Sequence, residues 1–368
     1  MSSILTRILE AGVKMGASDI HLISGQVPRI RLHGRIAVLE GAPPVSEAQI
    51  TCVVPEHVRG DFEAGRYHEL DFALESSAGR FRVNVFRENN GVSAVFRYIP
   101  ERIMTLEELG LPPSVRKIVD LTKGLVLITG PAGSGKTTTL ASIISEISER
   151  FPYRIITIED PIEYVYQSGL SLISQREVGI HTASFASALR SALREDPDVI
   201  LVGEMRDLET MSLAIKGALT GHLVFSTMHT ISASKTIDRL IEVFPAEQQN
   251  QVRTDFADVV ECIISQLLIP RKDGKGRVLA YEIMFANTAI RNLIREGKTY
   301  QIDSIMEMSR TDGMVCLDDC LEALVSAGMI SAEQAYARAK NRERFLSRER
   351  SISSVISLLS ERKKPGEN

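Results

Sequence analysis

The chain has 368 residues, of which 44% are hydrophobic and 24% are charged, and its net charge is −4. This composition is ordinary for a soluble globular protein of two or three domains, and no apolar run approaches the roughly 18 residues that a membrane-spanning helix needs. The acidic balance disfavours a dedicated nucleic-acid-binding protein, because such proteins carry a basic surface.

Residues 1–98 are expected to form a small α+β domain. A helix is predicted from residue 4 to residue 15, and the alternating segments "SDIHLIS" and "VPRIRLHGRIAVL" are typical of strands. Three further strands are expected in "YHELDFALES", "GRFRVNVFRE" and "GVSAVFRYI", with a turn at "RENNG". The pattern indicates a mostly antiparallel sheet, and the proline-punctuated stretch after it predicts a linker over residues 99–105.

From Lys123 the pattern changes. The apolar runs "GLVLITG", "YRIITIED", "PDVILVGEM" and "HLVFSTMHT" are typical of strands buried in a parallel sheet, and segments with helical spacing separate them. This alternation predicts an α/β domain with a parallel-rich sheet over residues 106–285. A helical region is expected over residues 286–360, followed by a disordered tail over residues 361–368.

The segment "GPAGSGKTT" matches the phosphate-binding pattern G-x-x-x-x-G-K-[ST] and lies between a predicted strand and a predicted helix. Its glycines allow backbone N–H groups to surround phosphate oxygens. Lys136 is expected to reach the β- and γ-phosphates of ATP, and the Thr137 hydroxyl is expected to ligate Mg²⁺. The predicted nucleotide-binding residues are Gly130, Pro131, Ala132, Gly133, Ser134, Gly135, Lys136, Thr137 and Thr138.

Two acidic segments follow predicted strands. "DVILVGEMRD" ends a strand in Glu204, which is expected to organise Mg²⁺ or to polarise the attacking water. "ITIEDPIEY" carries Glu159, Asp160 and Glu163; a metal-bound nucleotide would compensate their charges, and one of them could be the general base. We assign Glu159 to the metal and Glu163 to catalysis. The simpler alternatives are a strand-end acid that caps the loop and a solvated acidic turn.

Two histidines bracket the apolar run "TGHLVFSTMHT". If residues 222–229 are extended, His222 and His229 lie about 23 Å apart and cannot both contact one γ-phosphate in one subunit. His229 is expected at the carboxyl end of the strand, where it would contact the γ-phosphate and report hydrolysis; the alternative is a core histidine with satisfied hydrogen bonds. For His222 we expect a structural or inter-subunit hydrogen bond.

"GPAGSGKTTT", "ITIEDPIEY", "DPDVILVGEMRDLET" and "TGHLVFSTMHT" resemble the Walker A, Asp box, Walker B and His box of the type II/type IV secretion ATPase superfamily. Within it, "AIRNLIRE" resembles the PilT-type retraction ATPases of type IV pili. The resemblance implies a PAS-like amino-terminal domain, a RecA-like ATPase domain and a homo-hexameric ring that disassembles pili in twitching motility. It further implies a cytoplasmic motor at the inner membrane, with the pilus platform protein and a paralogous retraction ATPase as candidate partners.

The resemblance also assigns roles outside the phosphate site. Arg82 and Arg97 are implied to reach a nucleotide bound between domains, although composition alone would make them strand-surface arginines. The implied coupling segment comprises Ala289, Ile290, Arg291, Asn292, Leu293, Ile294, Arg295 and Glu296. Its spacing places Ala289, Ile290, Leu293 and Ile294 on one helical face, and an amphipathic helix packed on the ATPase domain is the simpler interpretation.

Two features bear on the choice between related functions. Leu219 stands where relatives of the superfamily usually carry a glutamate, which puts in doubt any mechanism that needs an acid beside His222. The four cysteines contain no CxxC pair and are expected to be reduced thiols. The absence of the tetracysteine insert of assembly ATPases favours retraction over pilus assembly or type II secretion. A RecA-like nucleic-acid translocase is a remote alternative, because the chain has no Trp and only 5% aromatic residues.

Overall fold

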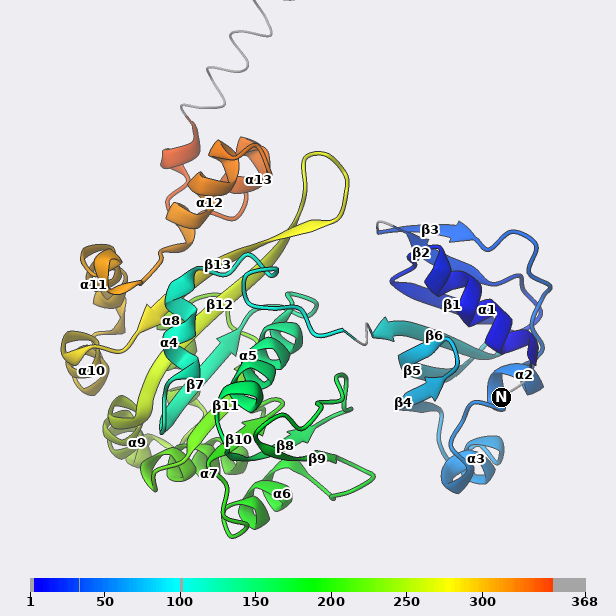
Figure 1. Cartoon of the computed structure of the whole chain (residues 1–368), viewed down its shortest axis with the longest axis horizontal. Helices are drawn as coiled ribbons and strands as arrows, with labels where there is room; N and C mark the ends of the chain where they lie inside the picture. Colours follow the sequence, from blue (N-terminus) through cyan, green and yellow to red (C-terminus); the bar gives the residue numbers. More distant parts are fainter. Residues whose placement is uncertain (1–2, 33, 100–101, 347–368) are drawn as a thin grey trace, which may run out of the picture.

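The computed structural model describes residues 3–32, 34–99 and 102–346, which form two bodies, each built on its own sheet (Figure 1). The amino-terminal sheet has six strands in the order β3-β2-β1-β6-β5-β4, and all neighbours are antiparallel. Its elements are α1 (Ser3–Lys14), β1 (Asp19–Ile23), β2 (Arg29–Leu32), β3 (Arg35–Val38), α2 (Glu47–Thr51), α3 (Glu56–Glu63), β4 (Glu69–Ser76), β5 (Gly79–Glu88) and β6 (Gly91–Ile99). The predicted antiparallel sheet is therefore confirmed.

The core of this first body follows from residue spacing. In α1, Leu5, Ile8, Leu9 and Gly12 recur at helical intervals and are all buried. In β5, Phe81, Val83 and Val85 alternate with more exposed residues and are fully buried. The alternate residues of β5, including Arg80 and Arg82, therefore lie on the opposite face of the sheet, away from this core.

The second sheet has seven strands in the order β13-β12-β7-β11-β10-β8-β9. All neighbours are parallel except β12 and β13. The elements are α4 (Arg116–Val119), β7 (Gly124–Thr129), α5 (Lys136–Arg150), β8 (Arg154–Glu159), β9 (Leu172–Glu177), α6 (Phe185–Ala192), β10 (Val199–Val202), α7 (Leu208–Leu219), β11 (Leu223–Met228), α8 (Ala233–Glu242), α9 (Ala246–Val259), β12 (Val260–Pro270) and β13 (Arg277–Phe285). Because the parallel strands run in one direction, their carboxyl ends meet at one edge of the sheet.

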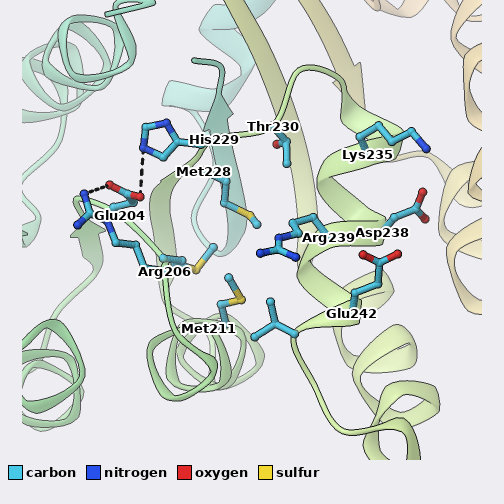
Figure 2. A pocket seen from close by; sticks show the side chains of 12 residues that line it. Glu204, Arg206, Met211, Met228, His229, Thr230, Lys235, Asp238, Arg239 and Glu242 are labelled. Carbon is cyan, nitrogen blue, oxygen red and sulfur yellow. Dashed lines mark ion pairs between the residues drawn. The ribbon is translucent and has the colours of Figure 1, made fainter. Parts of the chain in front are cut away.

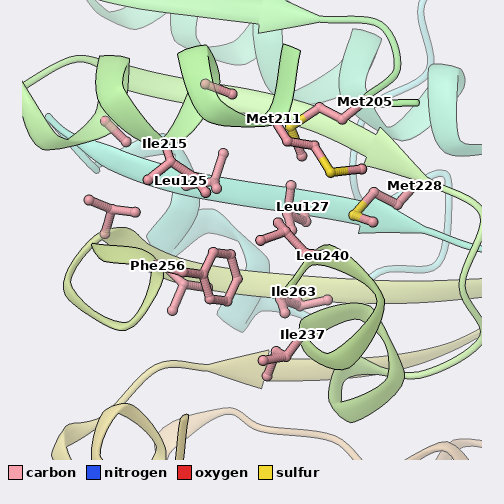
Figure 3. Close-up of a cluster of buried hydrophobic side chains, with 14 of the residues drawn as sticks. Leu125, Leu127, Met205, Met211, Ile215, Met228, Ile237, Leu240, Phe256 and Ile263 are labelled. Atoms are coloured by element: carbon pink, nitrogen blue, oxygen red, sulfur yellow. The ribbon is translucent and has the colours of Figure 1, made fainter. Parts of the chain in front are cut away.

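Helices cover both faces of this sheet, which explains why its central strands are buried and mostly apolar. Val126 and Ile128 of β7 belong to a cluster shared with α4 and α5. Leu125 and Leu127, the alternate residues of the same strand, pack with α7, α8 and α9 on the other face (Figure 3). All six residues of β7 and all six of β11 are buried, so every side chain of these strands must be small or apolar.

After β13 the described chain forms helices: α10 (Thr288–Arg295), α11 (Ile302–Met308), α12 (Leu317–Ser326) and α13 (Ala332–Tyr336). The predicted helical region extends to residue 360 and the predicted tail to residue 368, so residues 347–368 of these predictions lie outside the described residues, as do residues 100 and 101 of the predicted linker. The domain boundaries stay a prediction. None of the described helices combines the length and the apolar content of a membrane span.

The edges of the second sheet were not anticipated from the sequence. Neither β9 nor the antiparallel pair β12 and β13 was among the predicted strands. β12 is a long, mostly buried apolar run, and such a run is compatible with either a strand or a buried helix until its partner is known. Its pairing with β7 decides the matter.

Candidate active site

The phosphate-binding loop connects the end of β7 at Thr129 to the start of α5 at Lys136. Gly133 and Gly135 have φ angles of 73° and 90°, in the left-handed region that favours glycine. A Cβ atom on Gly130 would lie 2.3 Å from the carbonyl oxygen of Gln266. The loop therefore requires glycine at the positions of the sequence motif, both for its conformation and for its close approach to β12.

Lys136 folds back over this loop. Its Nζ donates hydrogen bonds to the carbonyl oxygens of Gly130 at 2.9 Å and Pro131 at 3.1 Å. Burial lowers the pKa of Lys136, and the negative charges of Glu204 and Glu163 partly oppose this effect. These charges place both acids in the surroundings of the ammonium group, as a shared phosphate site requires.

The loop also contains an unused donor. Within the described part of the chain, the Ser134 hydroxyl is buried and has no hydrogen-bond partner. A buried hydroxyl without a partner is unfavourable, so its presence favours a ligand that completes it. The N-terminus of α5 adds a partial positive charge at the same place. These features fit phosphate oxygens, and Thr137, in the first turn of α5, lies where it can bind a metal that accompanies them.

Glu204 lies two residues beyond β10, beside the end of β11. Its carboxylate oxygens are 3.1 Å from Nε2 of His229 and 2.8 Å from a guanidinium nitrogen of Arg206 (Figure 2). Burial acts to raise the pKa of Glu204, but the hydrogen bonds and charges of Arg206 and His229 outweigh it and hold the pKa below the ordinary value. Glu204 is therefore ionised near neutral pH. Arg206 was overlooked as a site residue, although it stands two positions after Glu204 in the quoted motif.

Glu159 ends β8 in a different environment. It is 5% exposed and accepts hydrogen bonds from Thr157 at 2.7 Å and from Gln175 at 3.0 Å. Burial raises its pKa to about 7, although the two hydrogen bonds act in the opposite direction. Its enclosure makes Glu159 a poorer candidate for a metal ligand than Glu204, and its partner Gln175 comes from β9.

Glu163, in the loop after β8, forms a contact between the two bodies. An Nη atom of Arg82, from β5, lies 3.4 Å from the Glu163 carboxylate, and a second donates to Asp71 at 2.9 Å. The neighbouring Arg80 donates to the carbonyl oxygen of Ile162 at 3.0 Å. Arg82 thus reaches the acidic segment within one chain. Arg80, which the sequence reasoning missed, shares its face of the strand because the two residues are two positions apart.

Arg97 makes a different contact. It is the cross-strand neighbour of Arg82 in the amino-terminal sheet, and it donates to Asp19 on β1 at 2.9 Å. Its side chain is 64% exposed. The structure therefore brings Arg82 to the acidic segment and pairs Arg97 within its own sheet, and a nucleotide contact for Arg97 stays a prediction.

His222 lies at the opposite end of β11 from His229. Its Nδ1 is 3.0 Å from the carbonyl oxygen of Gly217 and 3.1 Å from the Thr220 hydroxyl, where α7 ends. These are structural hydrogen bonds within the chain, in agreement with the expectation for His222. β11 spans only Leu223–Met228, so the two histidines flank the strand instead of lying within it.

The segment expected to couple movement forms α10 and the residue after it. Ile290 and Ile294 are fully buried, whereas Ala289, on the same side of the helix, is exposed. Arg291 contacts Glu261 at 2.9 Å and the Ala257 carbonyl oxygen at 2.8 Å, which fastens α10 to the end of α9. The buried side of α10 is therefore centred on Ile290 and Ile294, next to Arg291, and Ala289 lies at its opposite edge.

A cavity of about 510 Å³ opens beside Glu204 and His229. Figure 2 shows α8 on the other side of this cavity, with the Arg239 side chain extending toward the side of Glu204. The lining residues from α8 are Lys235, Asp238, Arg239 and Glu242. The described residues contain no group of three His, Cys, Asp or Glu side chains that could hold a metal by itself.

The parallel-rich sheet, the glycine loop with Lys136 and the acid Glu204 at the same edge define a P-loop nucleotide-binding protein. A family model described as "Type II/IV secretion system protein" matches residues 1–338. The chain belongs to this family.

Individual relatives match over nearly the whole chain. It is 48% identical over 346 residues to the "Type IV pilus retractation ATPase PilT" of Pseudomonas aeruginosa, covering 93% of this chain and 99% of that one. It is 47% identical over 345 residues to a "Twitching motility protein" of Neisseria gonorrhoeae, covering 93% and 91%. A solved structure described as the "Pilus Retraction Motor PilT and Bound ADP" is 45% identical, with a TM-score of 0.84 over 92% of this chain and 98% of that one.

Proposed function

We propose that this chain is the motor ATPase of type IV pilus retraction, which couples ATP hydrolysis to pilus disassembly. The observation that carries the proposal is the phosphate loop with Lys136, set beside Glu204 and His229 in a chain that matches a retraction ATPase over 93% of its length. The likeness to an ADP-bound structure supports an adenine nucleotide as the ligand.

The site divides the work of hydrolysis among its residues. Lys136 exchanges its loop carbonyl acceptors for β- and γ-phosphate oxygens and offsets their charge. The ionised Glu204 holds and orients the attacking water, with Arg206 and His229 fixing its carboxylate. Glu163, paired with Arg82, assists in removing the proton from this water.

Mg²⁺ fits the donor set of this edge, because hydroxyl, carboxylate and phosphate oxygens are the ligands that it prefers. Thr137 and Glu204 are the residues that would hold it, directly or through water, and Glu159 lies too deeply buried to be a preferred ligand. When bound, the ion would offset the negative charge of the phosphate oxygens.

Loss of the γ-phosphate supplies the mechanical step. ATP contacts His229 and draws the arginines of the amino-terminal sheet toward it, whereas ADP lacks these contacts, so the two nucleotides favour different arrangements of the two bodies. In a ring of six copies, such movements act on a pilus platform protein at the cytoplasmic face of the inner membrane, with a paralogous retraction ATPase as a candidate companion.

A deletion strain tests the direction of the motor. Removing the gene should leave cells with an excess of surface pili and no twitching, and the wild-type gene should restore twitching while a Lys136→Ala gene should not. Loss of surface pili instead would identify an assembly ATPase. A several-fold, salt-sensitive stimulation of ATP hydrolysis by DNA would support a translocase.

A further inference from the structure

Glu282 is a carboxylate in an apolar position of β13. It is 1% exposed. Ala280 and Met284, the alternate residues of the strand, belong to two different hydrophobic clusters, one formed with the C-terminal helices α12 and α13 and one with α7, α8 and α9. Glu282 therefore lies where these clusters meet. Burying a carboxylate is unfavourable unless it is paired and hydrogen-bonded, so each of its two oxygens needs a partner.

The first oxygen of Glu282 caps α8. Oε1 accepts a hydrogen bond from the backbone N–H of Ala233 at 2.8 Å, and Ala233 is the first residue of this ten-residue helix. The N-terminus of a helix has N–H groups without partners in the helix and a partial positive charge, so a buried carboxylate here is well placed. The position of Glu282 therefore sets the position of the first turn of α8.

The first turn of α8 in turn holds His229. Only Thr230 and Ile231 separate His229 from Ser232, the N-cap residue of the helix. The hydroxyls of Thr230 and Thr236 are 2.6 Å apart, and that of Thr236 also donates to the Ser232 carbonyl oxygen at 2.7 Å. A shift at the start of α8 therefore changes the place of the imidazole that contacts Glu204 at 3.1 Å.

The second oxygen of Glu282 contacts the C-terminal region. Oε2 lies 2.6 Å from Nζ of Lys340, which also pairs with Asp303 of α11 at 3.0 Å. The backbone N–H of Lys340 donates to Asp318, at the start of α12, at 2.9 Å. Lys340 thus moves with the C-terminal helices.

We propose that Glu282 is a positioning residue for ATP hydrolysis, which with Lys340 connects the C-terminal helices to the loop that carries His229. The inference rests on the proposed ATPase function and deepens it. A displacement of the C-terminal helices moves Lys340 and, through their ion pair, Glu282. The displacement of Glu282 then shifts the first turn of α8, and His229 moves with it. The route runs in the reverse direction when the nucleotide moves His229.

A double-mutant cycle on the full chain tests this route. Lys340→Met should lower kcat for ATP about tenfold while KM changes less than about twofold, and Lys340→Arg should restore most of the loss. In a His229→Ala background, Lys340→Met should change kcat by less than about twofold, because the residue through which it acts is gone. Lys272→Met, at an exposed lysine in the turn between β12 and β13, is the matched control and should leave kcat unchanged.

Rates are expressed per binding-competent subunit, from titration with a fluorescent ADP, so that a loss of folded protein is not counted. Wild-type kcat in Lys340→Met, or an equal fractional loss with and without His229, would overturn the inference and leave the ATPase function intact.

Hydrogen exchange supplies a second measurement, which does not depend on ATP turnover. Amides of residues 230–236 should exchange faster in Lys340→Met than in Lys272→Met, and equal rates would overturn the route even if the chain hydrolysed no ATP.

Discussion

The two ends of β11 carry the same residue type in different surroundings. At the carboxyl end, His229 lies 3.1 Å from Glu204 and lines an open cavity. At the amino end, His222 bonds to the Gly217 carbonyl oxygen and the Thr220 hydroxyl, where α7 ends. The carboxyl ends of parallel strands gather loops and helix N-termini, which suit anions, whereas the amino ends receive helix C-termini, which suit hydrogen-bond donors. The role of each histidine therefore depends more on the end of the strand at which it lies than on the residue type.

Lys136 is the residue whose loss should affect the carboxyl edge most. Lys136→Ala should lower ATP turnover about a thousandfold, because it leaves the charge of the phosphates uncompensated in a partly buried loop. Lys123→Ala, which removes an exposed lysine just before the amino end of β7, should leave turnover unchanged. A steady-state ATPase assay compares the two variants. Similar rates would mean that the carboxyl and amino edges of the sheet do not differ in their role in hydrolysis.

Glu159 should make stability depend on pH. Its pKa of about 7 lies above the ordinary value of 4.5. Its contribution to stability is therefore complete below pH 4.5 and is lost as the pH rises through about 7. The fall corresponds to roughly 3 kcal/mol of unfolding free energy. Glu159→Gln should remove most of it, measured by urea unfolding at pH 5 and pH 8, and an equal decrease in both proteins would show that Glu159 is not the group concerned.

Glu204 and Glu163 should separate binding from hydrolysis at the carboxyl edge. Glu204→Gln and Glu163→Gln should each bind ATP with little change and lower kcat about a hundredfold, because the amide cannot accept the proton of the attacking water. Fluorescent-nucleotide titration and single-turnover hydrolysis measure the two steps. A variant that keeps the wild-type kcat would remove that glutamate from the mechanism.

The two histidines give the smallest effects and the sharpest contrast. His229→Ala should lower kcat about tenfold with little change in stability. His222→Ala should keep the wild-type kcat. It should lower the free energy of unfolding by about 1 kcal/mol, because its hydrogen bonds are lost. ATPase rates and urea midpoints for both variants make the comparison, and the reverse pattern would contradict the assignment of the two ends.

The parts of the site that the sequence predicts are local. The glycine loop, Glu204 and His229 each follow an apolar strand directly, so the position of the strand already indicates the edge of the sheet at which they lie. Partners contributed by distant segments were not predicted. Gln175 reaches Glu159 from β9 and Glu282 reaches Ala233 from β13, and no periodicity in either segment signals the other. Arg82 was named only through the family resemblance. The sequence pattern of an arginine on the surface of a strand does not show whether a distant residue, here Glu163, pairs with it.

A structure with a non-hydrolysable ATP analogue and Mg²⁺ tests the central claim most directly. We predict that the γ-phosphate lies within hydrogen-bond reach of His229, directly or through one water, and that Lys136 has exchanged its two loop carbonyl acceptors for phosphate oxygens. His222 should keep its bonds to Gly217 and Thr220 at the other end of β11. A γ-phosphate placed away from His229, or a His222 that occupies its place, would contradict the account.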